Sequence, residues 1–182
     1  RDRSLSLKDR LRNLLLIAGE AQQLLDSENM AELAAFCTES WVISTKTDAG
    51  SGSWEAAACR CLQDLEILEP DWLALLKQWE QAPELPGFAP QDPEKLERIA
   101  VYFAFRYLLK AVNDGDLLGR AQFCALGVLV TDRLSRFVGL PEALRLFSRE
   151  IEHNEENLDT LLEQFWQTEG LSLSALLSAF GG

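Results

Sequence analysis

The C-terminal part of the sequence contains a helical stripe into which polar side chains intrude. In SREIEHNEENLDTLLEQF, which ends at Phe165, apolar residues recur every three or four positions, the spacing of one buried helix face. Asn154 occupies a position where this stripe requires an apolar residue, and Glu150, His153 and Asn157 surround it. A carboxylate, an imidazole and two amides on one buried face can orient a substrate or form a structural network. These residues are the first candidates for a site.

Cations lie inside the apolar stretches that precede this stripe. Arg106 and Lys110 are one helical turn apart, and Arg120 follows early in the next apolar stretch. A buried charge is costly unless it is paired and hydrogen-bonded, so acidic partners must be close. Asp114 and Asp116 lie at the turn between the two stretches, within reach of both. We therefore predict one polar cluster, which consists of Arg106, Lys110, Asp114, Asp116, Arg120, Glu150, His153, Asn154 and Asn157.

This predicted cluster has a definite geometry. We expect Arg106 or Lys110 to lie within salt-bridge distance of at least one of its carboxylates, which belong to Asp114, Asp116 and Glu150. Three interpretations remain open. The cluster is a structural ion network that sets helix register, or it is a pocket that orients a substrate or supports a neighbouring catalytic domain. Alternatively, the cations extend along the surface into solvent and no site exists.

The stripe also predicts where two neighbouring side chains point. Asn154 should turn inward toward the other polar groups, because it stands on the seam. Glu152 should project from the opposite face of the same helix. Cutting one partner of a buried pair leaves the other uncompensated. Removing Arg106 or Glu150 should therefore destabilise the protein far more than removing Glu152.

Several kinds of catalytic or metal site do not fit the sequence. Glu150-x-x-His153 matches one unit of a di-iron bundle site, but a complete site needs a second such unit, and the chain has 1 histidine. Cys59 and Cys61 form a C-x-C pair without the further ligands of a zinc site. No G-x-S-x-G elbow and no G-x-G-x-x-G loop is present. We therefore expect no metal bound by this chain.

Helical spacing dominates the chain, and the one strand-like run is WVIST at 41–45. We predict an all-α fold, a single multi-helix domain over residues 1–182 with two or three largely buried central helices. Its parts are N-terminal helices at 1–81, a proline-rich connector at 82–93 and core helices at 94–182, with 94–112, 117–138 and 141–167 as the packed centre. The chain begins with Arg1, directly before a helix, so we expect a piece of a longer protein.

Helix boundaries follow from capping residues. Ser4 or Ser6 can cap the first helix, and Asp92 followed by Pro93 starts the helix of the second half. Other expected boundaries are a cap at Ser53, a first-turn proline at Pro70 and a helix end at Gly139, with a flexible loop at 44–53.

Composition limits the partners of the protein. The chain is 47% hydrophobic and 25% charged, enough apolar residues for a sizeable core. Its net charge of −12 opposes binding to nucleic acid or anionic lipid, and suits a basic protein surface better. No apolar run is long enough to span a membrane, and Cys37 and Cys124 stand in apolar surroundings typical of core thiols. We expect a reduced, cytoplasmic protein, and the sequence leaves its oligomeric state open.

Three segments carry a resemblance to a known family. RYLLKAVNDGDLLGRAQF at 106–123 and FSREIEHNEENLDTLLEQF at 147–165 resemble the C-terminal half of flagellin lysine-N-methylase-like proteins. The opening RDRSLSLKDRLRNLLLIAGEAQQLL is similar to the segment before that half. The resemblance implies a parent enzyme that transfers a methyl group from S-adenosylmethionine to lysines of flagellin or a similar protein. It also implies an N-terminal cysteine cluster that holds an iron–sulfur or other metal centre.

That cysteine cluster is absent from this chain, because the C-x-C pair at 59–61 does not match it. The resemblance therefore implies the helical C-terminal region alone, needed for substrate docking or for completing the active site, without a cofactor of its own. Lysine methylation requires a desolvated channel and a proton acceptor, for which Glu150 or Asp116 could serve. The alternative is a non-catalytic helical interaction module with a structural buried ion network.

Overall fold

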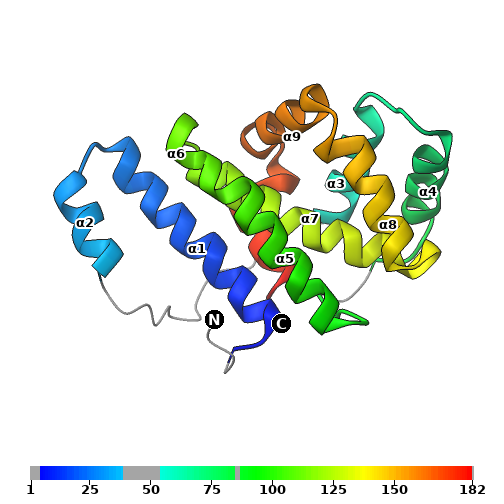
Figure 1. Cartoon of the computed structure of the whole chain (residues 1–182), viewed down its shortest axis with the longest axis horizontal. Helices are drawn as coiled ribbons and strands as arrows, with labels where there is room; N and C mark the ends of the chain where they lie inside the picture. Colours follow the sequence, from blue (N-terminus) through cyan, green and yellow to red (C-terminus); the bar gives the residue numbers. More distant parts are fainter. Residues whose placement is uncertain (1–4, 39–53, 85–86, 182) are drawn as a thin grey trace.

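The computed structural model describes residues 5–38, 54–84 and 87–181, and within these ranges every regular element is helical. Figure 1 shows an all-α arrangement in which the helices pack around α7. The α helices are α1 Leu7–Asp26, α2 Met30–Thr38, α3 Trp54–Asp64, α4 Pro70–Glu80, α5 Pro93–Tyr107, α6 Ala111–Asp114, α7 Leu117–Val138, α8 Leu140–Phe147, α9 Glu155–Gln167 and α10 Leu173–Ala179. The shorter elements are η1 Leu108–Lys110, the π-helical η2 Ser148–Glu152 and η3 Glu169–Leu171.

Helix α7 is the centre of the domain. Each residue from 121 to 134 is buried, and α7 contacts α1, α4, α5, α8, α9 and α10. Gly127 permits a close approach of α5, since a Cβ there would lie 2.9 Å from the Phe103 ring. One hydrophobic core joins residues from both halves of the chain, including Leu15, Leu62 and Leu176. The predicted all-α domain with buried central helices is confirmed.

Local capping chemistry sets many of the helix ends. The Ser6 and Asp92 side chains accept hydrogen bonds from the backbone N–H groups of Asp9 and Lys95. Pro70 opens α4, as expected for a proline in the first helical turn. Gly139 ends α7 with a φ of +80°, a left-handed value that glycine tolerates. The expected cap at Ser53, the loop at 44–53 and the strand-like run at 41–45 lie outside the described residues.

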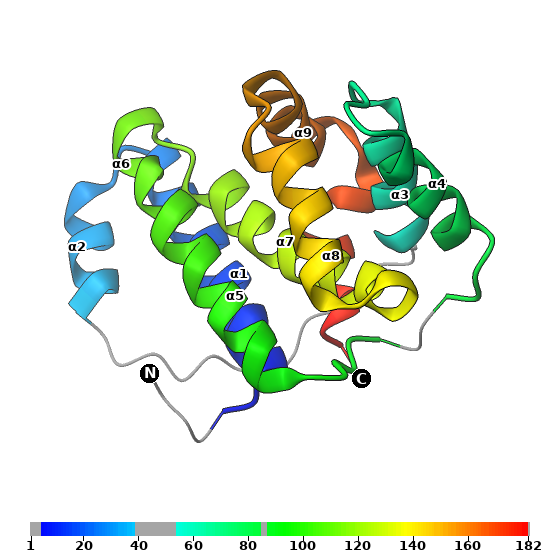
Figure 2. The same cartoon turned by 45° about the vertical axis from the view of Figure 1, so that its right-hand side comes forward.

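Helix α5 is less covered than expected for 94–112 as part of the packed centre. Its buried residues are Leu96, Ile99, Phe103 and Tyr107, which all lie on the face toward α7. The opposite side remains apolar and reaches solvent, as Phe105 does with 74% of its surface exposed. Figure 2 shows this side of α5 continuing into α6 at one end of the molecule.

The predicted continuous helix at 141–167 is wrong. Helix α8 ends at Phe147, the chain passes through the π-helical turn η2, and α9 begins after Asn154. Asn154 is the N-cap of α9, with its side-chain oxygen accepting from the backbone N–H of Asn157. The polar interruption of the apolar stripe thus marks a helix boundary.

The connector at 82–93 has no helix in its described part before α5 begins at Pro93. It brings the chain back to the core at the end of α10, where the Phe88 N–H donates to the Ala179 carbonyl and the Phe88 ring packs on Phe180. None of the helices described in the structure is long and apolar enough to cross a membrane.

Candidate functional site

Glu150 is the most deeply buried carboxylate of the predicted cluster, with none of its surface exposed. It stands in the π-helical turn η2 and faces the segment that leads into α4. Its two oxygens accept hydrogen bonds from the backbone N–H groups of Leu68, at 2.9 Å, and Glu69, at 2.7 Å. These donors lie at the N-terminus of α4, where the helix dipole favours a negative charge. Glu150 therefore holds two distant segments together.

The two asparagines extend the same contact. Asn157 donates to the carbonyl oxygens of Glu66 and Glu150, both at 2.8 Å, and accepts from the Glu66 N–H at 3.0 Å. Asn154 donates to the Glu66 carboxylate at 3.0 Å while it caps α9. Buried polar groups that are saturated in this way stabilise one arrangement of the backbone. This part of the predicted cluster is a clamp between 66–69 and 150–157, and we call it the backbone clamp.

Arg106 and Lys110 lie in a different place. The Tyr102 and Tyr107 hydroxyls each donate to the Glu152 carboxylate at 2.8 Å, and the Arg106 Nε lies 3.7 Å from it. Lys110 stands over the Tyr107 ring, 5.3 Å from its centre. Burial, followed by the bond to Glu152, raises the pKa of Tyr102 to about 12. Glu152, expected on the face opposite the seam, does contact different residues from Glu150, but it is buried, with its carboxylate at the centre of this second group.

A third group occupies the turn before α7. The Asp114 carboxylate pairs with Arg120 at 2.6 Å, and Asp116 caps α7 by accepting from the Gly119 N–H at 2.8 Å. Gln22 of α1 also bonds this turn, because its side-chain oxygen accepts from the Leu117 N–H at 2.8 Å. The predicted cluster is therefore divided into three separate groups.

The prediction that Arg106 or Lys110 pairs with one of the predicted carboxylates fails as a result. Within the described ranges, the ion pair of Arg106 is with Glu152, and Lys110 has no carboxylate within salt-bridge distance. Neither cation meets a carboxylate of Asp114, Asp116 or Glu150. His153 is exposed, and it lines an open hollow beside Glu69, Arg145, Ser148 and Arg149.

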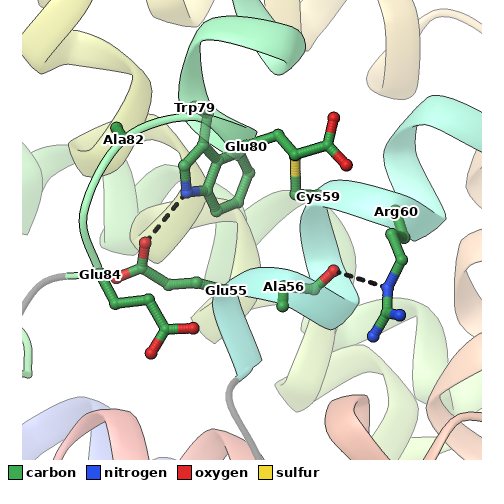
Figure 3. A pocket seen from close by; sticks show the side chains of 8 residues that line it. All are labelled: Glu55, Ala56, Cys59, Arg60, Trp79, Glu80, Ala82 and Glu84. Carbon is green, nitrogen blue, oxygen red and sulfur yellow. Dashed lines mark hydrogen bonds between the residues drawn. The ribbon is translucent and has the colours of Figure 1, made fainter.

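An acidic pocket that the sequence analysis did not find lies between α3 and the end of α4 (Figure 3). Its volume is about 230 Å³, and it is lined by Glu55, Ala56, Cys59, Arg60, Trp79, Glu80, Ala82 and Glu84. In Figure 3 the Glu55 carboxylate meets the edge of the Trp79 ring, and the Glu80 carboxylate points away from it. Pockets that hold small-molecule ligands measure roughly 300–1,000 Å³, so this one is smaller than most of them.

Glu55, which lines the acidic pocket, belongs to a buried ion pair. The Glu55 carboxylate accepts from the Trp79 indole N–H and lies 3.0 Å from the Arg133 Nε. The Arg133 guanidinium also donates to the Pro83 carbonyl at 2.5 Å. Arg133 and the neighbouring Asp132 are charges inside the continuously buried stretch 121–134 of α7. Like Arg106 and Lys110, they are charges within an apolar stretch of the sequence, which is a signal of buried pairing.

The thiols of the core are poor nucleophiles. Burial raises the pKa of Cys59, with Gln63 opposing the change and the carboxylates of Glu80 and Glu55 adding to it. Burial also raises the pKa of Cys61 to about 11 and that of Cys124 to about 12. A catalytic cysteine requires a lowered pKa, so these thiols do not fit that role. Cys37 is exposed on α2, contrary to the expectation of a core position.

Among the described residues, no three His, Cys, Asp or Glu side chains are grouped so that they could hold a metal ion. The comparisons with known proteins add no identity, since no protein family, no curated protein and no solved structure matches the chain.

Proposed function

We propose that this chain is the non-catalytic, helical C-terminal region of a protein that resembles S-adenosylmethionine-dependent lysine-N-methylases, acting on flagellin or a similar protein. In this proposal the region docks protein and supports an active site that lies elsewhere in its parent. The parent would bind S-adenosylmethionine and carry the metal cluster in its N-terminal part. The chain itself would work in the cytoplasm without a cofactor.

The observation that carries this proposal is how the two resembling segments meet. Tyr107 and Phe123 belong to the first segment, and their ring centres are 4.7 Å apart. Phe147 belongs to the second, and its ring centre is 6.3 Å from that of Phe123. The Tyr107 hydroxyl also bonds Glu152 of the second segment. A sequence pattern whose residues contact one another in the core is expected of a folding unit that a family would retain.

The polar residues support a docking role over a catalytic one. Glu150 and Asn157 are saturated by backbone groups, and Asp116 caps a helix. Catalytic groups must instead meet the reacting atoms, with a pKa matched to proton transfer. The two residues considered as lysine proton acceptors, Glu150 and Asp116, are therefore assigned here to structure.

A second candidate is a helical interaction module in a protein unrelated to methyl transfer. It is favoured by the exposed apolar side of α5 and α6, where Leu109 and Val112 project into solvent. Large exposed apolar patches mark interaction sites irrespective of any enzyme nearby.

Methyl transfer separates the candidates. Labelled S-adenosylmethionine is added to the longest native protein that contains this chain, with flagellin as the acceptor, and lysine methylation is measured by mass spectrometry. The first candidate predicts transfer by that protein and none by the chain alone, which should also give no heat with S-adenosylmethionine in calorimetry. Transfer by the chain alone would contradict a non-catalytic region. No cofactor binding by the longer protein would leave the second candidate.

A further inference from the structure

One side of α5 and its continuation exposes a row of large apolar residues. Tyr102, Phe105, Leu109 and Val112 are 44%, 74%, 62% and 88% exposed. They follow one another at intervals of three, four and three residues, through α5, η1 and α6. This spacing is the seam along which one helix packs on another. We call this row the α5–α6 face.

The exposure of the α5–α6 face does not result from poor packing of α5. The other side of the same helix is fully engaged, with Phe103 and Tyr107 buried against α7 and Phe123. Single exposed apolar residues are ordinary in proteins, but an aligned row along one helix leaves a continuous apolar strip in water. Burying such a strip contributes roughly 25 cal/mol per Å². A partner that covers it would therefore gain affinity.

Charge along the α5–α6 face has the opposite sign to that of the protein. The net charge of the chain is −12, yet the stretch 98–113 contains Arg98, Arg106 and Lys110 and no carboxylate. The Arg106 side chain is 43% exposed, and its Nε lies a long 3.7 Å from the Glu152 carboxylate. Over the part of the chain that the structure describes, the Lys110 ammonium meets an aromatic ring and no acidic group. The edge of the apolar row is therefore cationic.

We propose that the α5–α6 face docks an amphipathic helix of a partner protein, with carboxylates beside its apolar seam. The seam packs on Phe105, Leu109 and Val112, and the carboxylates pair with Arg106 and Lys110. Helices bind such surfaces through residues three and four positions apart, and charges at the rim set the choice of partner. The inference rests on the proposed docking function and adds the chemistry of the partner. A second copy fits less well, because an antiparallel pair would bring two cationic edges together.

The test uses two synthetic helices that differ only in charge. Both carry leucines spaced three and four residues apart, one with glutamates beside the leucines and the other with lysines there. Binding to the purified chain is followed by fluorescence anisotropy. The glutamate peptide should bind at least about tenfold more tightly than the lysine peptide, a difference of about 1.4 kcal/mol. Lys110→Glu should remove or reverse that preference.

Matched variants locate the contact. Leu109→Gln should weaken the binding of the glutamate peptide at least about tenfold, as loss of a central apolar anchor does. Trp166→Gln removes another exposed large side chain, 61% accessible on α9, and should leave binding unchanged. Both sites are on the surface, so neither variant should unfold the chain.

Each other outcome overturns the inference in a distinguishable way. Equal or tighter binding of the lysine peptide, lost in Leu109→Gln, would refute the acidic partner and leave the docking function standing. Absence of binding by both peptides would refute docking at this face, while the methyl-transfer test would still decide the function of the parent. A dimer in sedimentation equilibrium that Leu109→Gln dissociates would show that a second copy occupies the face.

Discussion

The backbone clamp and the α5–α6 face invert the usual distribution of polarity. The clamp buries Glu150 and Asn157 completely or nearly so, whereas the face leaves Phe105, Leu109 and Val112 in solvent. The polar groups of Glu150 and Asn157 form hydrogen bonds of 2.7 to 3.0 Å with other groups of the chain. The apolar groups outside have no such cover among the described residues. Residues of unexpected polarity stabilise the fold in one region, and in the other they form the surface that we propose for docking.

Among the polar contacts, the largest expected effect is that of removing the buried carboxylate of the clamp. Glu150→Ala leaves the Leu68 and Glu69 N–H groups without acceptors, which should cost about 3 kcal/mol of unfolding free energy. Urea unfolding measures the loss, with Glu163→Ala on the exposed side of α9 as the control. Equal midpoints for the two variants would show that the clamp does not stabilise the fold.

Removing Glu152 should have the next largest effect. Glu152→Ala takes the acceptor from the Tyr102 and Tyr107 hydroxyls and the partner from Arg106, for an expected loss of about 2 kcal/mol. A double-mutant cycle with Tyr107→Phe should give a coupling of about 1 kcal/mol. Additive losses would mean that the Tyr107 bond to Glu152 contributes nothing.

Alkaline pH should weaken the protein through the same tyrosines. Burial and the Glu152 bond raise the pKa of Tyr102 to about 12, so the native state holds this proton more tightly than the unfolded chain, whose tyrosines titrate near about 10. The contribution is therefore complete below about pH 10 and is lost as the pH rises toward 12. Urea unfolding from neutral to alkaline pH should show the decline, and Tyr102→Phe should make it shallower. An unchanged slope in that variant would contradict the assignment.

The smallest effect is expected on the α5–α6 face. Phe105→Ala should change the unfolding free energy by less than about 0.5 kcal/mol, because its ring is already in water. Phe103→Ala is the matched control two residues away on the buried side, and should cost about 3–5 kcal/mol. A large loss in Phe105→Ala would mean that the face is covered by the chain itself.

The sequence predicts the elements of this fold better than it predicts their polar contacts. Ser6, Asp92 and Pro70 act on atoms a few residues away, so their roles follow from local chemistry. Glu150 bonds backbone N–H groups 82 and 81 positions earlier, and no pattern of side chains reveals a backbone donor. The cluster was predicted on the assumption that charged side chains pair with one another, and Glu150 was therefore expected beside the wrong partners.

Two further errors have distinct physical origins. Glu152 follows Glu150 by two positions and faces away from it, but Tyr102 and Tyr107 of α5 cover that side, a long-range contact that helical spacing does not reveal. The exposure of Leu109 was missed because apolar residues look alike in sequence whether their own core or a partner covers them. Periodicity finds apolar faces but does not say what buries them.

Amide hydrogen exchange at Leu68 and Glu69 tests the central claim most directly. If Glu150 is a structural group, both N–H groups are held by its carboxylate and should exchange as slowly as the amides of α7. In Glu150→Ala they should exchange at least about a hundredfold faster, while the amides in the middle of α7 remain the slowest in the chain. Fast exchange at Leu68 and Glu69 in the unaltered protein would contradict the account, because the Glu150 carboxylate would then be free for another role.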